Sequence, residues 1–376
     1  MSAWPGKYVL GLTGNIATGK SVVRKMLEHL GAYGIDADAL AHRAIAKDAP
    51  GYAPIVEAFG RRILAQDGEI DRSKLGRVVF SDADALAELE AILHPLVRQA
   101  IDALVRRAKH RVIVIEAIKL LEGPLRQACD SLWVTTAPAE IQLVRLVQKR
   151  GMSAEAARQR INAQPLQEHK LVAADVIIYT DGSFERVWHQ VVAAWQNTVP
   201  APAVQPEQAR RARRGLQAEH GGPRQAEEIA AFISRLSKGR RSLDRADIMA
   251  AFGERAFLLL RQDGNLAGLA GWQVENLVAR TSEVYLEPGL PYGEAMRVMM
   301  EEIERASAEL LCEASLVFLP PHLARHESVW KALGYEIRQS KSLGVRAWEE
   351  AAIESMPVGT VLLFKQLRKD RVLRPV

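Results

Sequence analysis

A phosphate-binding spacing occurs near the start of the chain, where residues 14–21 read GNIATGKS. In the pattern G-x-x-x-x-G-K-[ST], glycines let backbone N–H groups turn inward around a phosphate because they carry no Cβ. Lys20 is expected to reach the β- and γ-phosphates, and the Ser21 hydroxyl is placed to bind Mg²⁺. The predicted ligand is a nucleoside triphosphate, contacted by Gly14, Asn15, Ala17, Thr18, Gly19, Lys20, Ser21 and Val22.

Two carboxylates, Asp36 and Asp38, follow in the segment IDADALA (35–41). At the carboxyl end of a strand in an open α/β sheet, they would face the ligand crevice beside the loop. Two residues apart on an extended chain, they would point to opposite faces and take separate roles. One would orient or deprotonate an attacking hydroxyl, and the other would help hold the metal. Asp38 has a second interpretation, as the N-cap of a helix over 39–46.

Further charged residues fit the same chemistry. Glu116 ends the apolar run RVIVIE (111–116), at the edge where a P-loop enzyme often keeps a carboxylate for Mg²⁺. A plain surface position explains Glu116 equally well. Between 145 and 160 lies a basic cluster, and charges on an amphipathic helix usually form its solvated face. Phosphoryl transfer instead needs arginines from a mobile helical lid, and Arg145 and Arg150 are the candidates.

Strand-like and helix-like segments alternate along the chain around these residues. Short apolar runs at 8–13, 111–116, 132–135 and 176–179 are separated by helical periods. Continuous apolar strands between helices predict an α/β domain with a parallel sheet covered on both faces. After residue 225 a helix precedes a hairpin around Asp263-Gly264-Asn265, which predicts a second, α+β domain.

A change in composition separates the two halves. Residues 198–225 are rich in Pro, Gln, Arg and Gly and nearly free of large apolar side chains. Such a stretch buries too little surface to offset the entropy of ordering it, which predicts a linker. The predicted domains are therefore 1–197 and 226–376. The arginines of the linker have no aromatic residues between them for base stacking, so nucleic acid is not favoured as a partner.

Composition excludes several classes of protein. The 376 residues are 48% hydrophobic and 25% charged, with a net charge of +5, which is the balance of a globular protein. No apolar run approaches the ~18 residues that span a bilayer, so no membrane association is expected. Cys129 and Cys312 lie far apart and predict neither a disulfide scaffold nor a zinc site. A reduced, cytoplasmic protein is expected.

Together these segments resemble dephospho-CoA kinases. The resemblance covers about residues 8–196 and rests on GLTGNIATGKS (11–21), IDADALA (35–41), LEAILHPLV (89–97) and RINAQ (160–164). It implies ATP-dependent, Mg²⁺-assisted phosphorylation of the ribose 3′-hydroxyl of dephospho-CoA, the last step of coenzyme A biosynthesis. It also implies a P-loop core, a lid, and a helical CoA-binding region over about 41–107.

The same resemblance implies roles for individual residues. Asp38 would act on the acceptor hydroxyl, with Asp36 beside it in the substrate site, and His94 would support the substrate pocket. Arg145 would supply charge from the lid. Three positions depart from the family pattern: Glu116 replaces an aspartate, Lys149 replaces the second lid arginine and is followed by Arg150, and Thr180 replaces an asparagine.

The second half resembles the GCN5-related N-acetyltransferase (GNAT) fold. Its segment at 287–295 lacks the basic residue of that family's pyrophosphate loop, and Pro291 has no N–H to donate. A GNAT-like module that binds CoA or a protein partner is therefore expected rather than an acetyltransferase. Two other functions remain open for the chain: a kinase for another hydroxyl-bearing metabolite, and a regulatory NTP-binding switch.

Overall fold

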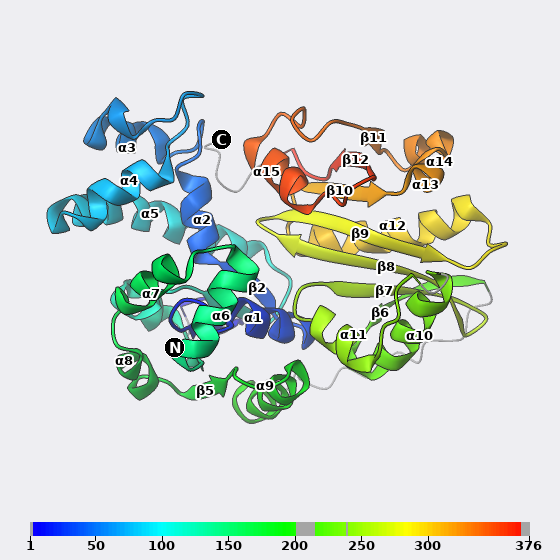
Figure 1. Cartoon of the computed structure of the whole chain (residues 1–376), viewed down its shortest axis with the longest axis horizontal. Coiled ribbons are helices and arrows are strands. Elements are labelled where there is room, and N and C mark those ends of the chain that lie inside the picture. The colour runs from blue at the N-terminus through cyan, green and yellow to red at the C-terminus, as the bar shows by residue number, and fades with distance from the viewer. Residues whose placement is uncertain (1–2, 201–214, 238–239, 370–376) are drawn as a thin grey trace.

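Two sheets with helices packed on their faces make up the computed structural model (Figure 1). The structure describes residues 3–200, 215–237 and 240–369. No helix within these ranges is long and apolar enough to cross a membrane. The first sheet belongs to the N-terminal half and the second to the C-terminal half, as the sequence predicts.

The first sheet has five parallel strands in the order β2-β3-β1-β4-β5. They are β1 (Tyr8–Thr13), β2 (Tyr33–Asp36), β3 (Val112–Glu116), β4 (Ser131–Thr136) and β5 (Val176–Tyr179). All five residues of β3 are buried, because helices cover both faces of the sheet. The predicted α/β fold with a parallel sheet is confirmed.

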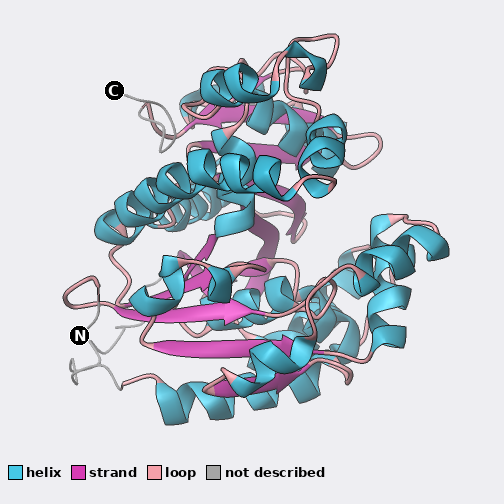
Figure 2. Ribbon diagram, turned by 90° about the vertical axis from the view of Figure 1, so that its left-hand side faces the viewer, coloured by secondary structure: helices cyan, strands magenta, loops and turns pink. Residues whose placement is uncertain are grey.

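Helices pack on both faces of this sheet (Figure 2). One face carries α1 (Lys20–His29) and α9 (Phe184–Thr198), which bury Met26 and Val191 against it. The other face carries α2 (Ala37–Ala44) and the long α5 (Ala83–Arg107). The remaining helices of this half are α3 (Tyr52–Phe59), α4 (Arg72–Phe80), α6 (Ala139–Arg150), α7 (Ala154–Asn162) and α8 (Gln167–Val172). Of these, α3 and α4 pack with α5 into a separate helical lobe.

The second sheet has seven strands in the order β11-β12-β10-β9-β8-β7-β6. They are β6 (Leu216–Gly221), β7 (Ala256–Gln262), β8 (Asn265–Glu275), β9 (Val278–Leu286), β10 (Ala314–Leu319), β11 (Glu336–Ile337) and β12 (Val361–Gln366). Within this sheet β9 and β10 pair in parallel, and the other strand pairs among the described residues are antiparallel. The predicted hairpin is confirmed as β7–β8, with Asp263 and Gly264 in left-handed backbone conformations at its turn.

Helices also cover both faces of the second sheet. One face carries α12 (Tyr292–Glu309), whose buried methionines form core as helical spacing predicts. The other face carries α10 (Ala226–Leu236), α11 (Arg245–Ala251) and α15 (Arg346–Ser355). Two short helices, α13 (Pro321–Ala324) and α14 (Glu327–Ala332), complete this half. The prediction of an α+β second half is confirmed.

The predicted linker over 198–225 is too long at its C-terminal end. Residues 201–214 lie outside the described residues, but Leu216–Gly221 forms β6. This strand lies at the edge of the sheet, paired antiparallel with β7. An edge strand needs few apolar side chains, so its polar composition resembles that of a linker. The division of the chain into domains remains a proposal.

The two halves share buried apolar surface. Leu277 and Leu311 of the second half belong to the same buried cluster as Tyr33 and Leu104 of the first. On another side, Phe184 of α9 packs against the cluster formed by α10 and α11. The halves are therefore joined by packing and not only by the connecting segment.

Candidate active site

Residues 14–19 connect β1 to α1, and Lys20 and Ser21 are the first two residues of α1, as the spacing of the phosphate loop (14–21) predicts. Glycine is required at two positions. A Cβ on Gly14 would lie 2.5 Å from the carbonyl oxygen of Thr135, and Gly19 has a φ of 86°. The first N–H groups of α1 have no partner within the helix and carry the positive end of its dipole. The loop and the start of α1 thus form a cradle for an anion. Val22 follows as the third residue of α1, half-buried against the sheet.

Lys20 lies inside this cradle and is only 7% exposed. Its Nζ donates hydrogen bonds to the carbonyl oxygens of Gly14 and Asn15, both at 3.1 Å. Burial lowers the pKa of Lys20, while the negative charges of Glu116 and Asp38 oppose that shift. A buried ammonium held at the loop and flanked by carboxylates is poised to neutralise phosphate charge.

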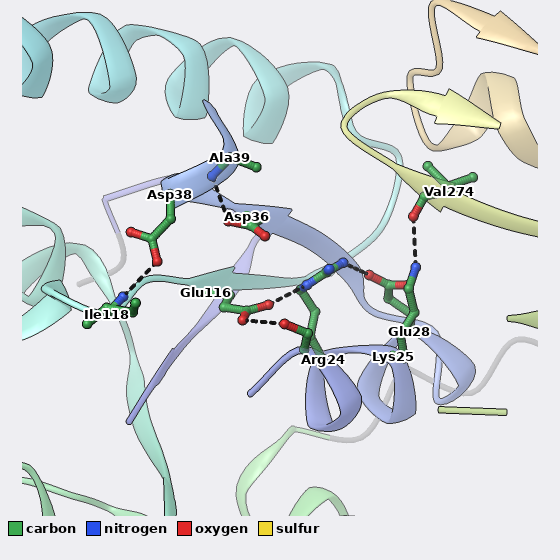
Figure 3. Close-up of polar contacts among 10 residues, drawn as sticks. Arg24, Lys25, Glu28, Asp36, Asp38, Ala39, Glu116, Ile118 and Val274 are labelled. Atoms are coloured by element: carbon green, nitrogen blue, oxygen red, sulfur yellow. Dashed lines mark hydrogen bonds and ion pairs between the residues drawn. The ribbon is translucent and has the colours of Figure 1, made fainter. Parts of the chain in front are cut away.

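Glu116 joins the loop to the body of α1 (Figure 3). One carboxylate oxygen accepts a hydrogen bond from Ser21 Oγ at 2.9 Å, and the other accepts one from Arg24 Nε at 2.7 Å. Arg24 also donates to Glu28 at 2.6 Å. Glu116 is 4% exposed, so the surface interpretation of this residue is wrong. Ser21 and Glu116 together present hard oxygen atoms of the kind that Mg²⁺ prefers.

The two aspartates of the IDADALA segment lie where β2 becomes α2. Asp36 is the N-cap of α2, since its carboxylate accepts a hydrogen bond from Ala39 N at 2.8 Å. The alternative prediction, that Asp38 is the cap, is wrong. Asp38 lies in the first turn of α2 and not on an extended chain, and its Oδ2 accepts a hydrogen bond from Ile118 N at 3.1 Å.

The two carboxylates line different cavities, although the expected alternation along an extended chain does not apply because Asp38 is helical. Asp38 lines a cavity of about 860 Å³, whereas Asp36 lines a cavity of about 50 Å³ next to the second half. Burial and the nearby Glu116 raise the pKa of Asp36 to about 6. Burial also raises the pKa of Asp38, against the opposing effects of the Ile118 N–H and the Lys20 charge. A partly desolvated carboxylate beside the phosphate cradle is suited to accept a proton. A substrate contact of Asp36 remains a prediction.

The large cavity lies between α2, α4, α5 and the segment after β3. His94, on α5, lines it together with Asp38. Both basic and apolar side chains line it, including His42, Arg72, Arg77, Arg160, Leu75 and Leu89. Its volume is in the upper part of the range of small-molecule pockets. This composition suits a ligand that has both phosphate groups and a long apolar portion.

The lid residues differ in how closely they approach the loop. Arg145 Nη1, on α6, donates to the carbonyl oxygen of Ala17 at 3.0 Å and to Thr180 Oγ1 at 3.1 Å. Arg150, the last residue of α6, is exposed, and its charge contributes to the lowered pKa of Lys20. Thr180 packs on the loop as well, donating to the carbonyl oxygen of Thr18 at 2.8 Å. Arg145 therefore contacts the phosphate loop directly, and the catalytic roles of both arginines remain predictions.

Several residues near the loop had no predicted role. Gln164 and Gln167 accept hydrogen bonds from the backbone N–H groups of Ile16 and Asn15, at 2.7 and 3.0 Å. Lys170 is 4% exposed and donates to the carbonyl oxygen of Ile118 at 3.0 Å. Burial lowers the pKa of Lys170 to about 8, and the Lys20 charge adds to this effect. The RINAQ motif contains Gln164, but no local pattern indicates Gln167 or Lys170.

Comparisons with known proteins agree with this geometry. Residues 8–186 match the family model of dephospho-CoA kinase. A curated dephospho-CoA kinase of Moorella thermoacetica is 40% identical over 204 residues, which are 53% of this chain and 96% of that protein. The dephospho-CoA kinase of Streptomyces avermitilis is 43% identical over 191 residues, which are 50% of this chain and 93% of that protein.

Among solved structures, N-acetyltransferases match the second half of the chain. The PaiA N-acetyltransferase of Thermoplasma acidophilum, in complex with coenzyme A, matches with a TM-score of 0.31 and 10% identity. The match covers 40% of this chain and 99% of that one. Similarity at this level assigns no activity to the second half.

Proposed function

We propose that this chain, which belongs to the dephospho-CoA kinase family, transfers the γ-phosphoryl group of ATP to the ribose 3′-hydroxyl of dephospho-CoA. The products are CoA and ADP. One observation carries the proposal: Asp38 lines a large cavity and accepts a hydrogen bond from Ile118 N, and the carbonyl oxygen of Ile118 accepts one from Thr13, the residue before the phosphate loop. In this proposal the proton acceptor and the phosphate cradle belong to one site.

In this proposal the loop and Lys20 hold the triphosphate. Backbone N–H groups at the start of α1 contact phosphate oxygens, and Lys20 gives up its bonds to the carbonyl oxygens of Gly14 and Asn15 to bind them. Arg145 and Lys170 add positive charge on two further sides. Phosphoryl transfer depends mainly on such positioning and charge neutralisation, so the backbone N–H groups and the charges of Lys20, Arg145 and Lys170 are well matched to it.

Asp38 acts on the acceptor. Its carboxylate takes the proton of the 3′-hydroxyl as the oxygen forms its bond to the γ-phosphorus and the bond from that phosphorus to the β-γ bridging oxygen breaks. The Ile118 N–H holds the carboxylate in place. In the cavity, apolar side chains receive the pantetheine arm and basic ones receive the diphosphate of the acceptor. His94 supports this pocket from α5.

The residues present also fit Mg²⁺. Ser21 Oγ and Glu116 would hold the ion, since both are oxygen ligands and lie 2.9 Å apart beside the loop. When bound, the ion would neutralise charge on the β- and γ-phosphate oxygens. We place the reaction in the cytoplasm, because Cys129 and Cys312 are both free and buried, which fits a reducing compartment.

The test is a reaction with ATP, Mg²⁺ and dephospho-CoA, followed by mass spectrometry of the products. We expect CoA and ADP in equal amounts. A panel of other hydroxyl-bearing acceptors separates this proposal from a different metabolite kinase. Slow ATP hydrolysis that no acceptor accelerates would contradict the proposal and favour a nucleotide-binding switch.

A further inference from the structure

The turn between β8 and β9 projects from the second half against the first half. Here residues 274–277 are called the β8–β9 tip. Asn276 and Leu277 both have left-handed backbone conformations, with φ of 51° and 60°. That conformation is unfavourable for leucine and persists only where the surroundings hold it. Leu277 is 8% exposed and lies within the buried cluster of the first half, which supplies such surroundings.

One contact of the tip leads to the phosphate loop through α1. The carbonyl oxygen of Val274 accepts a hydrogen bond from Lys25 Nζ at 2.9 Å, and the same Nζ donates to Glu28 at 2.9 Å. Glu28 in turn accepts from Arg24, which donates to Glu116. Figure 3 shows this series of contacts running from Val274 to Glu116. Because Glu116 accepts from Ser21, the series ends at the phosphate loop.

A second contact of the tip leads to the aspartate through α2. Arg43 Nη1 donates to the carbonyl oxygen of Asn276 at 2.9 Å. Arg43 Nη2 contacts both carboxylate oxygens of Glu313, at 2.7 and 2.8 Å. The Glu313 side chain is 0% exposed, and Glu313 N donates to the carbonyl oxygen of Leu277 at 2.7 Å. Arg43 is thus anchored in the second half while Asp38 occupies the first turn of the same helix.

We infer that the β8–β9 tip is a positioning element of the phosphoryl-transfer site, with Lys25 and Arg43 as its positioning residues. It holds α1, which carries the phosphate cradle, and α2, which carries Asp38, in fixed relation to each other. The inference rests on the proposed function. A displacement of about 1 Å between reacting groups lowers the rate on the order of 100-fold, so loss of the contacts of the β8–β9 tip is expected to lower turnover.

The relatives indicate how large a loss of turnover to expect when the contacts of the β8–β9 tip are removed. The first half of this chain matches almost the whole length of the Moorella and Streptomyces kinases, which leaves little room in them for a counterpart of the tip. The tip therefore supplies alignment and not a chemical group. We expect its loss to lower turnover partly, by about tenfold, which is well short of the effect of removing a proton acceptor.

The experiment compares four variants of the full chain: Arg43→Met, Arg43→Lys, Lys25→Met and Arg245→Met. The last one is the matched control, because Arg245 pairs with Glu185 at 3.0 Å across the same two halves but contacts neither α1 nor α2. For each variant, kcat and both KM values are measured with ATP and dephospho-CoA. Thermal unfolding is followed in parallel.

We expect kcat to fall about tenfold in Arg43→Met and Lys25→Met, with KM values within about threefold of those of the unmodified chain. Arg43→Lys should recover most of the loss, since lysine keeps the charge next to Glu313. Arg245→Met should remain within twofold. If Arg43→Met does not fold, Lys25→Met and Arg43→Lys still test the inference. Lys25→Met should fold, because Glu28 keeps its ion pair with Arg24 when Lys25 is replaced.

Three results would overturn the inference. They are unchanged kcat in folded Lys25→Met and Arg43→Met, a rise in KM alone, and an equal loss in Arg245→Met. An unmodified chain that does not turn over dephospho-CoA is a different result, since it removes the proposed function itself.

Discussion

Replacing Asp38 with asparagine separates the proposed chemistry from the fold. Asparagine has nearly the same size, and its carbonyl oxygen can still accept the hydrogen bond from Ile118 N. It cannot accept the proton of an attacking hydroxyl at neutral pH. The variant should therefore fold normally and bind ATP through the intact loop, but it should lack the proton acceptor of the reaction.

The expected magnitude follows from these two facts. General-base catalysis is worth about 10²–10⁴-fold, or about 2.7–5.4 kcal/mol of activation free energy, so kcat should fall by that factor. The free energy of unfolding should change by less than about 1 kcal/mol, because the hydrogen bond to Ile118 N is kept. In the unmodified chain, burial raises the pKa of Asp38, so kcat/KM should rise with pH through a pKa above that of an ordinary aspartate.

The assay is ADP release with dephospho-CoA as acceptor, together with urea denaturation and calorimetric titration of ATP. Asp130→Asn is the matched control, because Asp130 accepts a backbone hydrogen bond from Val9 at 2.7 Å just before β4, at the opposite end of the sheet. This control should turn over normally. If Asp38→Asn keeps turnover within tenfold of the unmodified chain, Asp38 is not the proton acceptor.

Three further substitutions test neighbouring groups. Lys20→Met should lower kcat by about 10²–10³-fold in the same assay, and a smaller loss would argue against its role at the phosphates. Arg24→Met should lower the free energy of unfolding in urea by about 3–5 kcal/mol, because Glu116 and Glu28 stay buried without it; a change below 1 kcal/mol would contradict this. Asp36→Asn should be more stable than the unmodified chain by up to about 3 kcal/mol at pH 8 and by less than about 1 kcal/mol at pH 4. The folded state keeps the Asp36 proton to a pKa of about 6, above that of the unfolded chain, so stability falls as pH rises between these values. Equal stabilisation at both pH values would refute that reasoning.

Sequence reasoning succeeded where chemistry depends on neighbours along the chain. The phosphate loop was predictable because its glycines, lysine and serine act within eight consecutive residues between a strand and a helix. The placement of Asp38 beside that loop was predictable from the order of the elements. The backbone conformation of Asp38 was not predictable, because Asp36 is the N-cap of α2 and Asp38 therefore lies in the helix and not in the strand.

Residues that act across large distances in sequence could not be predicted. Arg24, Lys25 and Arg43 lie on amphipathic helices, where a charged residue usually belongs to the solvated face. Here their partners are Glu116, Val274 and Glu313, and the last is 270 positions away from Arg43. The Arg24–Glu116 pair forms within the first half, whereas Lys25 and Arg43 reach Val274 and Glu313 only when the two halves dock.

The docking has a consequence for how the chain is made. β2 is the outermost strand of the first sheet, and an uncovered outer strand attracts strands of other molecules. Tyr33 and Ile35 of β2 are each 2% exposed, and residues 274–277 lie alongside them. A nascent chain folds from its N-terminus, so residues 274–277 cannot lie against this strand until they have left the ribosome. We expect the edge of β2 to be open to strands of other molecules during that interval.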